Sequence, residues 1–283
     1  MIAAAVVAAL VGIGALGLWW WLRVPTLDYD TPEAIALFAR VLNGEHDQQD
    51  RAISALAGAI DAHPGDARAH LWFGLANMHA FIGNDELPYA IRATRALDRA
   101  VELDPSDTSA AGWRAFWRFQ VADNRGDDLA GPRRELLDAA EGDPRFTPFL
   151  VAVAMADEPL DSGWPQRALP PLEAIEDCGD GTASSCRTGH LFPHGTEGFH
   201  ATLGDLKVRL GDVEGGRAQY ARARALPTYA DWPYRDAFEA WTEGADERAR
   251  RLTNDDPGDD PTIFFASGDR ACAACHEASS SGS

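Results

Sequence analysis

Runs of β-branched residues, the usual mark of strands, are scarce in this 283-residue chain, and only 5 residues are tyrosine. Alanine and leucine, which favour helix, are abundant instead. Hydrophobic residues make up 46% of the chain and charged residues 24%, which is too apolar for a disordered chain and sufficient for one large domain or an array of repeats. The composition therefore predicts an all-α protein.

An excess of positive charge is also missing, because the chain carries a formal net charge of −19. Such a surface repels a phosphate backbone, so we expect no nucleic-acid partner. The acidic surface suits a basic soluble partner, or it simply keeps the protein in solution.

Charged residues are absent from the first 22 positions, which end in Trp19, Trp20, Trp21 and Leu22 before Arg23. About 20 apolar residues span a bilayer as a helix. The tryptophans would lie in the aromatic belt, and no small-x-small cleavage site follows. We therefore predict an uncleaved transmembrane anchor over residues 1–23, with a cleaved signal peptide as the alternative.

Three stretches repeat one pattern, in which an alanine comes five residues before a proline. The pairs are Ala59 and Pro64, Ala100 and Pro105, and Ala139 and Pro144. Small alanines let two helices pack closely, and proline cannot continue a helix, so the pattern marks the end of a helix that packs against its neighbour. These stretches resemble the second helix of a tetratricopeptide repeat.

The clearest unit lies at residues 199–227. Its matches to the tetratricopeptide positions, in order, are Leu203, Gly204, Gly211, Gly216, Tyr220 and Ala223. Pro227 comes one residue early, and His200 replaces the usual tryptophan. Trp72 and Leu75 also match the W-x-x-L opening of the repeat. The resemblance covers roughly 32–145 and 199–250, and it implies a solenoid of helix hairpins over 30–252 that binds other proteins.

An insertion at about 157–198 does not fit the repeat, and we expect it to be irregular because it contains five prolines. A long irregular insertion in a compact array is often functional. Cys178 and Cys186 enclose a polar loop in this insertion. In an oxidising compartment the pair predicts a disulfide, with two free thiols as the alternative.

Cys272, Cys275 and His276 form a C-x-x-C-H motif in the tail, 253–283, which begins with an acidic, proline-broken stretch. Two thiols at this spacing can each add to one vinyl group of a haem, and the adjacent histidine becomes the proximal iron ligand. A zinc site would need two further ligands, and a thioredoxin-type redox motif would need a βαβ context. The motif resembles that of the c-type cytochromes over these five residues alone, and it predicts one covalent haem c.

No methionine or histidine follows His276, so a sixth iron ligand has to come from upstream. His194 is our first candidate and His190 the second, both in the insertion. His200 occupies a repeat-helix position and is expected to be a packing residue, although the three histidines together could also bind a transition metal. Candidates of lower rank are His63, His70, His79, Met78 and Met155.

Haem c is attached outside the cytoplasm, so the motif orients the anchor with its N-terminus inside. We predict a single-pass protein of the cell inner membrane with its bulk on the periplasmic side. It would transfer electrons within or to a larger assembly, with membrane or periplasmic redox proteins as partners. No nucleophile elbow, phosphate loop or paired-carboxylate site argues for an enzyme. The alternatives are a scaffold or assembly protein with a structural haem, and a haem enzyme or gas sensor with an open iron position.

Overall fold

The structure is a computed structural model that describes residues 24–42, 45–84, 86–142, 147–155, 158–174, 195–232 and 234–254. Every regular element in these ranges is a helix, which confirms the all-α prediction for this part of the chain. Within the same ranges, no helix is both long and apolar enough to cross a membrane. The anchor predicted for residues 1–23 lies outside them.

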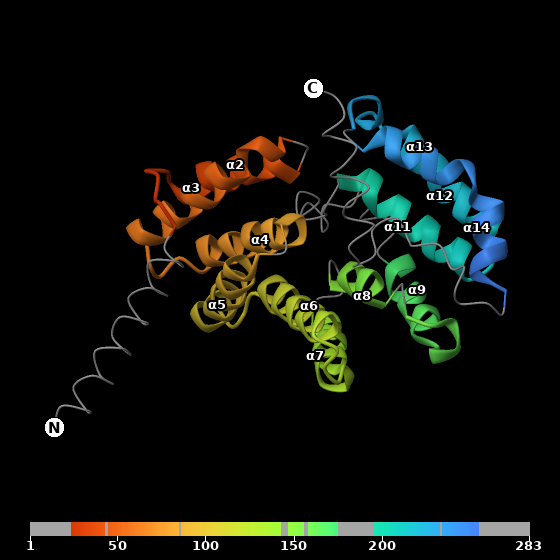
Figure 1. The fold of residues 1–283 in the computed structure, drawn as a ribbon, viewed down its shortest axis with the longest axis horizontal. Helices are drawn as coiled ribbons and strands as arrows, with labels where there is room; N and C mark the ends of the chain where they lie inside the picture. Colours follow the sequence, from red (N-terminus) through yellow and green to blue (C-terminus); the bar gives the residue numbers. More distant parts are fainter. Residues whose placement is uncertain are drawn as a thin grey trace, which may run out of the picture. The chain divides into compact units, whose positions relative to one another are not determined.

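The described residues fall into two compact units, which we treat separately. Unit 1 comprises those within 1–38 and 47–103, and unit 2 those within 39–46 and 104–283. The first helices are α2 (Thr31–Leu42), whose greater part belongs to unit 1, α3 (Gln49–Ala62), α4 (Ala67–Asn84) and α5 (Leu87–Leu103) (Figure 1). Unit 2 continues with α6 (Thr108–Asn124), α7 (Ala130–Gly142), α8 (Thr147–Met155), α9 (Trp164–Ala174), α11 (Gly195–Arg209), α12 (Val213–Ala225), α13 (Arg235–Glu243) and α14 (Ala245–Leu252).

Consecutive helices pack against each other as hairpins, among them α4 with α5, α6 with α7, and α11 with α12. Helix α3 ends at Ala62 and α5 at Leu103, and the prolines that follow, Pro64 and Pro105, lie in turns. The helix ends expected at these two prolines are therefore confirmed. Pro144 lies outside the described ranges.

An aspartate lies directly before each of the helices α4, α6 and α12 and caps its N-terminus. Asp107 accepts hydrogen bonds from the backbone N–H groups of Ser109 and Ala110 at the start of α6, and Asp212 accepts one from Gly215 in α12. Asp66 does the same for α4 and also accepts from the Thr31 hydroxyl at 2.6 Å. Partial burial raises the pKa of Asp66, but these hydrogen bonds outweigh it and the pKa is lowered. Capping by aspartate satisfies amides that the helix itself leaves unpaired.

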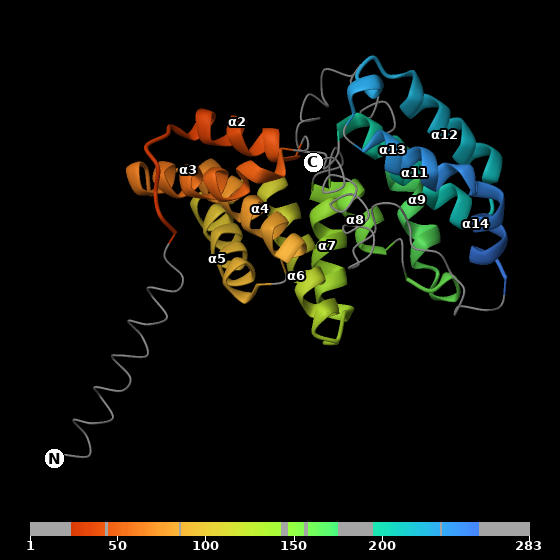
Figure 2. The ribbon, with the colours of Figure 1, turned by 45° about the horizontal axis from the view of Figure 1, so that its top comes forward.

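Helix α11 is the central helix of unit 2. It contacts α8, α9, α12 and α14, and the two views of the fold show α12 and α14 beside it (Figure 2). Its apolar side chains Ala201, Leu203, Leu206 and Val208 are all fully buried. A helix that is buried on nearly all sides needs core packing in several directions, and α8, α9, α12 and α14 together provide this packing for α11.

The crossing of α11 and α12 depends on two glycines that the sequence pattern singled out. A Cβ atom on Gly204 would lie 2.5 Å from Cε1 of Tyr220 and 3.0 Å from the carbonyl oxygen of Gly216. A Cβ atom on Gly216 would in turn lie 2.8 Å from the carbonyl oxygen of Gly204. The backbones approach each other so closely here that any side chain would force them apart.

Replacing Gly204 with alanine is expected to destabilise unit 2 by about 1–3 kcal/mol, the usual cost of overpacking a core. Alanine has a higher helix propensity than glycine, so a loss of stability would come from overpacking at the crossing and not from a weakened helix. Gly83→Ala is the matched control, because nothing lies within 4 Å of a Cβ atom at that helical glycine. It should be neutral or stabilise by up to about 1 kcal/mol. Urea unfolding followed by circular dichroism would compare the two, and an equal effect of both changes would contradict this account of the crossing.

Helix α9 corrects the predicted extent of the irregular insertion. We expected about 157–198 to be irregular, but Leu160–Ser162 forms a 3-10 turn and Trp164–Ala174 an α-helix that includes Pro170 and Pro171. Proline inside a helix removes a hydrogen bond and crowds the preceding turn. Ala168 and Leu172 of α9 are nevertheless fully buried, and this packing outweighs the local preference. Residues 175–194 lie outside the described ranges.

An ion pair joins α9 to the central helix. Lys207 of α11 is the only lysine in the 283-residue chain, and its ammonium group pairs with the carboxylate of Glu173. The lysine side chain is 13% exposed. The carboxylate of Glu173 is 40% exposed, so the pair lies at the solvent edge of the junction between the two helices.

Candidate functional site

The residues predicted to attach the haem, Cys272, Cys275 and His276, lie outside the described ranges, and so do the two cysteines of the predicted disulfide, Cys178 and Cys186. His190 and His194 also lie outside them. These assignments stay predictions. The described part ends at Asn254, directly after α14. The helices that precede the tail are therefore the described part of the chain nearest in sequence to the motif.

The last four helices of unit 2 meet at one buried carboxylate. Asp205 of α11 has a fully buried side chain and forms a two-pronged ion pair with Arg248 of α14, with N–O distances of 3.0 and 2.9 Å. Trp241 of α13 donates its indole N–H to the same carboxylate at 2.8 Å. Tyr220 of α12 donates its hydroxyl proton to it as well. One acidic side chain thus connects α11 to α12, α13 and α14.

Charge and burial explain why this arrangement is stable. Burial lowers the pKa of Arg248, but the adjacent Asp205 charge and hydrogen bonds outweigh this and raise it. Burial, and then Asp205, raise the pKa of Tyr220, so its hydroxyl remains a proton donor. The guanidinium group also lies 4.4 Å from the ring centroid of Trp241, at cation–π distance. A buried charge pair is tolerated when an opposite charge and further hydrogen bonds offset the loss of water in this way.

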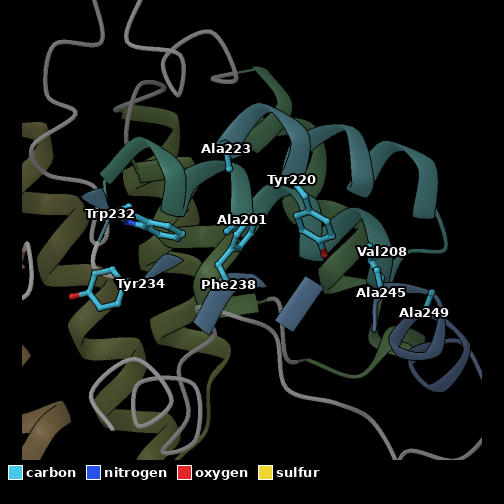
Figure 3. Close-up of a cluster of buried hydrophobic side chains, with 9 residues drawn as sticks. All are labelled: Ala201, Val208, Tyr220, Ala223, Trp232, Tyr234, Phe238, Ala245 and Ala249. Atoms are coloured by element: carbon cyan, nitrogen blue, oxygen red, sulfur yellow. The ribbon is translucent and has the colours of Figure 1, made fainter. Parts of the chain in front are cut away.

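An apolar cluster that includes Tyr220 lies between the same helices. Phe238 of α13 makes edge-to-face contacts with Tyr220 and Trp232, each at a ring-centroid distance of 5.6 Å. Figure 3 shows the cluster gathered between α11, α12, α13 and α14. Its members are Ala201, Val208, Tyr220, Ala223, Trp232, Tyr234, Phe238, Ala245 and Ala249. The packing joins these helices into one unit, and the tail follows the last of them, α14, in the sequence.

His200 lies in the core of unit 2, as expected for a packing residue. It is fully buried in α11, and its Nδ1 lies 2.8 Å from the side-chain oxygen of Gln219 in α12. That oxygen can only accept, so Nδ1 carries the proton in this contact. The imidazole therefore holds α11 and α12 together.

The candidate ligands of lower rank take up separate structural positions. In unit 1, His79 pairs with Gln49 at 2.7 Å, His63 is exposed at the end of α3, and burial lowers the pKa of His70. Met78 and Met155 are buried, as core packing predicts. Over the described ranges, no three histidine, cysteine, aspartate or glutamate side chains form a group that could hold a metal ion. The transition-metal site considered for His190, His194 and His200 includes two residues outside these ranges.

Sequence reasoning missed the Asp205 cluster, although a signal was present. Ala201, Asp205 and Val208 follow the i, i+4, i+7 spacing of one helix face. An acid at the middle position of an apolar face indicates a buried partner. Four arginines lie between the end of α12 and the end of α14, so the pattern alone could not identify Arg248 among them.

Comparison of the chain with family models, with curated proteins and with solved structures found no match. Function is therefore inferred from the chain's own residues. Two sets of residues carry the inference: the motif in the tail, and the packed helices from which the tail continues.

Proposed function

We propose that this protein is a membrane-anchored periplasmic monohaem c-type cytochrome that transfers electrons within or to a larger protein assembly. The observation that carries the proposal is the C-x-x-C-H motif at Cys272, Cys275 and His276. The donor set fits a haem, since two thiols can form thioethers and an imidazole can ligate iron. The bound haem would supply one-electron chemistry, and these residues would hold it.

A tetratricopeptide-like solenoid is the proposed architecture of the helices. The paired helices, the turns at Pro64 and Pro105, and the close crossing at Gly204 and Gly216 support it. Solenoids of this kind offer extended surfaces to other proteins. In this chain the array would bind the redox partner while the tail carries the electron.

The span of the tail limits where the haem can act. The 17 residues from 255 to 271 separate the last described residue from Cys272, and an extended chain covers at most about 3.6 Å per residue. Cys272 is 20 residues beyond Leu252, so the haem is attached within about 70 Å of the end of α14. Its electron partner must be bound within this distance. The net charge of −19 favours a partner with a basic face.

Absorption spectra of the purified full-length protein, oxidised and reduced, test this function. An electron carrier should show six-coordinate, low-spin iron, because a fixed ligand set changes little when the charge changes. We expect His194→Ala to convert the spectrum to high spin, with His190→Ala as the second choice. His63→Ala is the control, since His63 is exposed at the end of α3.

High-spin iron in the native protein, unchanged by either loop substitution, would contradict the loop-histidine assignment. It would instead support an enzyme or gas sensor with an open iron position. A haem that neither oxidant nor reductant affects would support the scaffold alternative.

A further inference from the structure

The chain between the apolar N-terminal run and α2 is fixed on α3. The backbone N–H of Leu27 donates to the carbonyl oxygen of Ser54 at 3.0 Å. A Cβ atom on Gly58 would lie only 1.7 Å from the carbonyl oxygen of Leu27. Only glycine permits this approach, so Gly58 is the residue that lets the segment lie against the helix.

Further contacts hold the residues on the C-terminal side of Leu27. Arg51 of α3 donates to the Tyr29 hydroxyl at 2.7 Å. Asp30 accepts from the backbone N–H of Glu33 at 2.8 Å and so caps α2. Thr31 bonds to Asp66 at the start of α4. Residues 27–31 are thus tied to three helices of unit 1.

The order of these contacts gives the segment a direction. Tyr29 meets Arg51 near the beginning of α3, whereas Leu27 meets Ser54 and Gly58 further along it. The segment therefore runs antiparallel to α3. A chain that continued in this direction before Leu27 would approach the end of α3 at Ala62.

The distance to the proposed anchor is short. The apolar run ends at Leu22, five residues before Leu27, so their Cα atoms lie at most about 18 Å apart. No long linker separates a membrane segment from unit 1. Leu27 is also one of three large hydrophobic side chains exposed among the described residues, with 39% of its surface accessible; the others are Ile82 and Leu87.

We propose that unit 1 rests on the phospholipid interface through Leu27 and the C-terminal end of α3. The proposal depends on the anchor in the proposed function. The occupant is a neutral phospholipid surface, because two acidic residues, Asp28 and Asp30, flank Tyr29, the partner of the single base Arg51, and this balance gives no net attraction to anionic lipid. Unit 1 is then held at the bilayer, and the length of the tail sets how far from α14 the haem can lie.

Lipid photo-crosslinking of the full-length protein in phosphatidylcholine vesicles tests the proposal. A photoreactive benzoylphenylalanine is placed in separate variants at Leu27, Ala62 and Leu87. Leu87 is the matched control, since it is 61% exposed and lies two residues from Tyr89, which bonds to Asp50 near the start of α3. We expect lipid adducts at positions 27 and 62 to exceed those at 87 at least five-fold. Equal adducts at 62 and 87 would overturn the proposal.

One further variant separates this inference from the proposed function. A photoreactive residue at Trp20 should give strong lipid adducts if the anchor spans the membrane. Absence of lipid adducts at position 20, together with release of the protein into the soluble fraction, would overturn the proposed membrane anchor. The proposed docking of unit 1 would then be overturned as well. Strong adducts at 20 with equal adducts at 62 and 87 would overturn the docking alone.

Gly58→Ala tests the role of the contact with Leu27. Unit 1 should come away from the bilayer, so adducts at Ala62 should fall several-fold while those at Trp20 remain. Gly83→Ala is the control, because its surroundings are open. Unchanged adducts at Ala62 would contradict the contact's role. Should Gly58→Ala fail to fold, the comparison of positions 62 and 87 in the otherwise native chain still decides the proposal.

Discussion

Replacing both Cys272 and Cys275 with alanine is expected to abolish retention of haem after denaturation, and Cys275→Ala alone should weaken it. The native protein should keep its haem, because thioether bonds survive unfolding whereas the bond from His276 to iron does not. The measurement is haem staining on a denaturing gel, together with the mass of the intact chain. The expression host must have working cytochrome c maturation.

The other two cysteines provide a matched control. Replacing Cys178 and Cys186 with alanine removes the same number of thiols and should leave the haem attached. Native protein that is purified without haem from such a host would refute the assignment of the motif. The helices of unit 2 should be retained in all variants, since the contacts described for α11 to α14 include no cysteine.

Asp205→Ala is expected to lower the free energy of unfolding of unit 2 by about 3–5 kcal/mol, the usual cost of removing one partner of a buried ion pair. Arg248, whose side chain is 10% exposed, would lose its counter-charge. Tyr220 and Trp241 would lose their acceptor. The measurement is chemical unfolding followed by tryptophan fluorescence and circular dichroism.

Asp236→Ala is the control for this substitution. Asp236 pairs with Arg235 on α13, but its side chain is 87% exposed, and such pairs contribute little. We expect no measurable change from it. Equal effects of the two substitutions would show that the buried carboxylate does not hold the helices together. Asp205→Leu combined with Arg248→Met should recover part of the lost stability, because it removes both charges.

Local signals in the sequence predicted much of the helical arrangement. Proline opposes the continuation of a helix through its own geometry, so Pro64 and Pro105 predicted turns without any knowledge of the fold. The small residues Gly204 and Gly216 marked a close crossing, because only residues of that size allow it. The all-α class followed in the same way from composition.

Features that depend on distant residues could not be predicted. Pro170 and Pro171 locally oppose a helix, and only the burial of Ala168 and Leu172 explains α9. Arg248 lies 43 residues from Asp205, and nothing local distinguishes it from neighbouring arginines. At the candidate site, sequence spacing supplied the motif and its chemistry. The helices that support the tail became apparent only from their contacts.

The single lysine has a practical consequence for the chemistry used to study complexes of this protein. Most protein cross-linkers and many surface-coupling reagents react with primary amines. Apart from the chain's N-terminus, the only amine is that of Lys207, which is paired with Glu173 and 13% exposed. Reagents of this kind would therefore miss a bound partner even where the complex is abundant. Carboxylate-directed reagents are the appropriate choice, because the chain has 44 acidic side chains and exposed ones such as Asp236 can react.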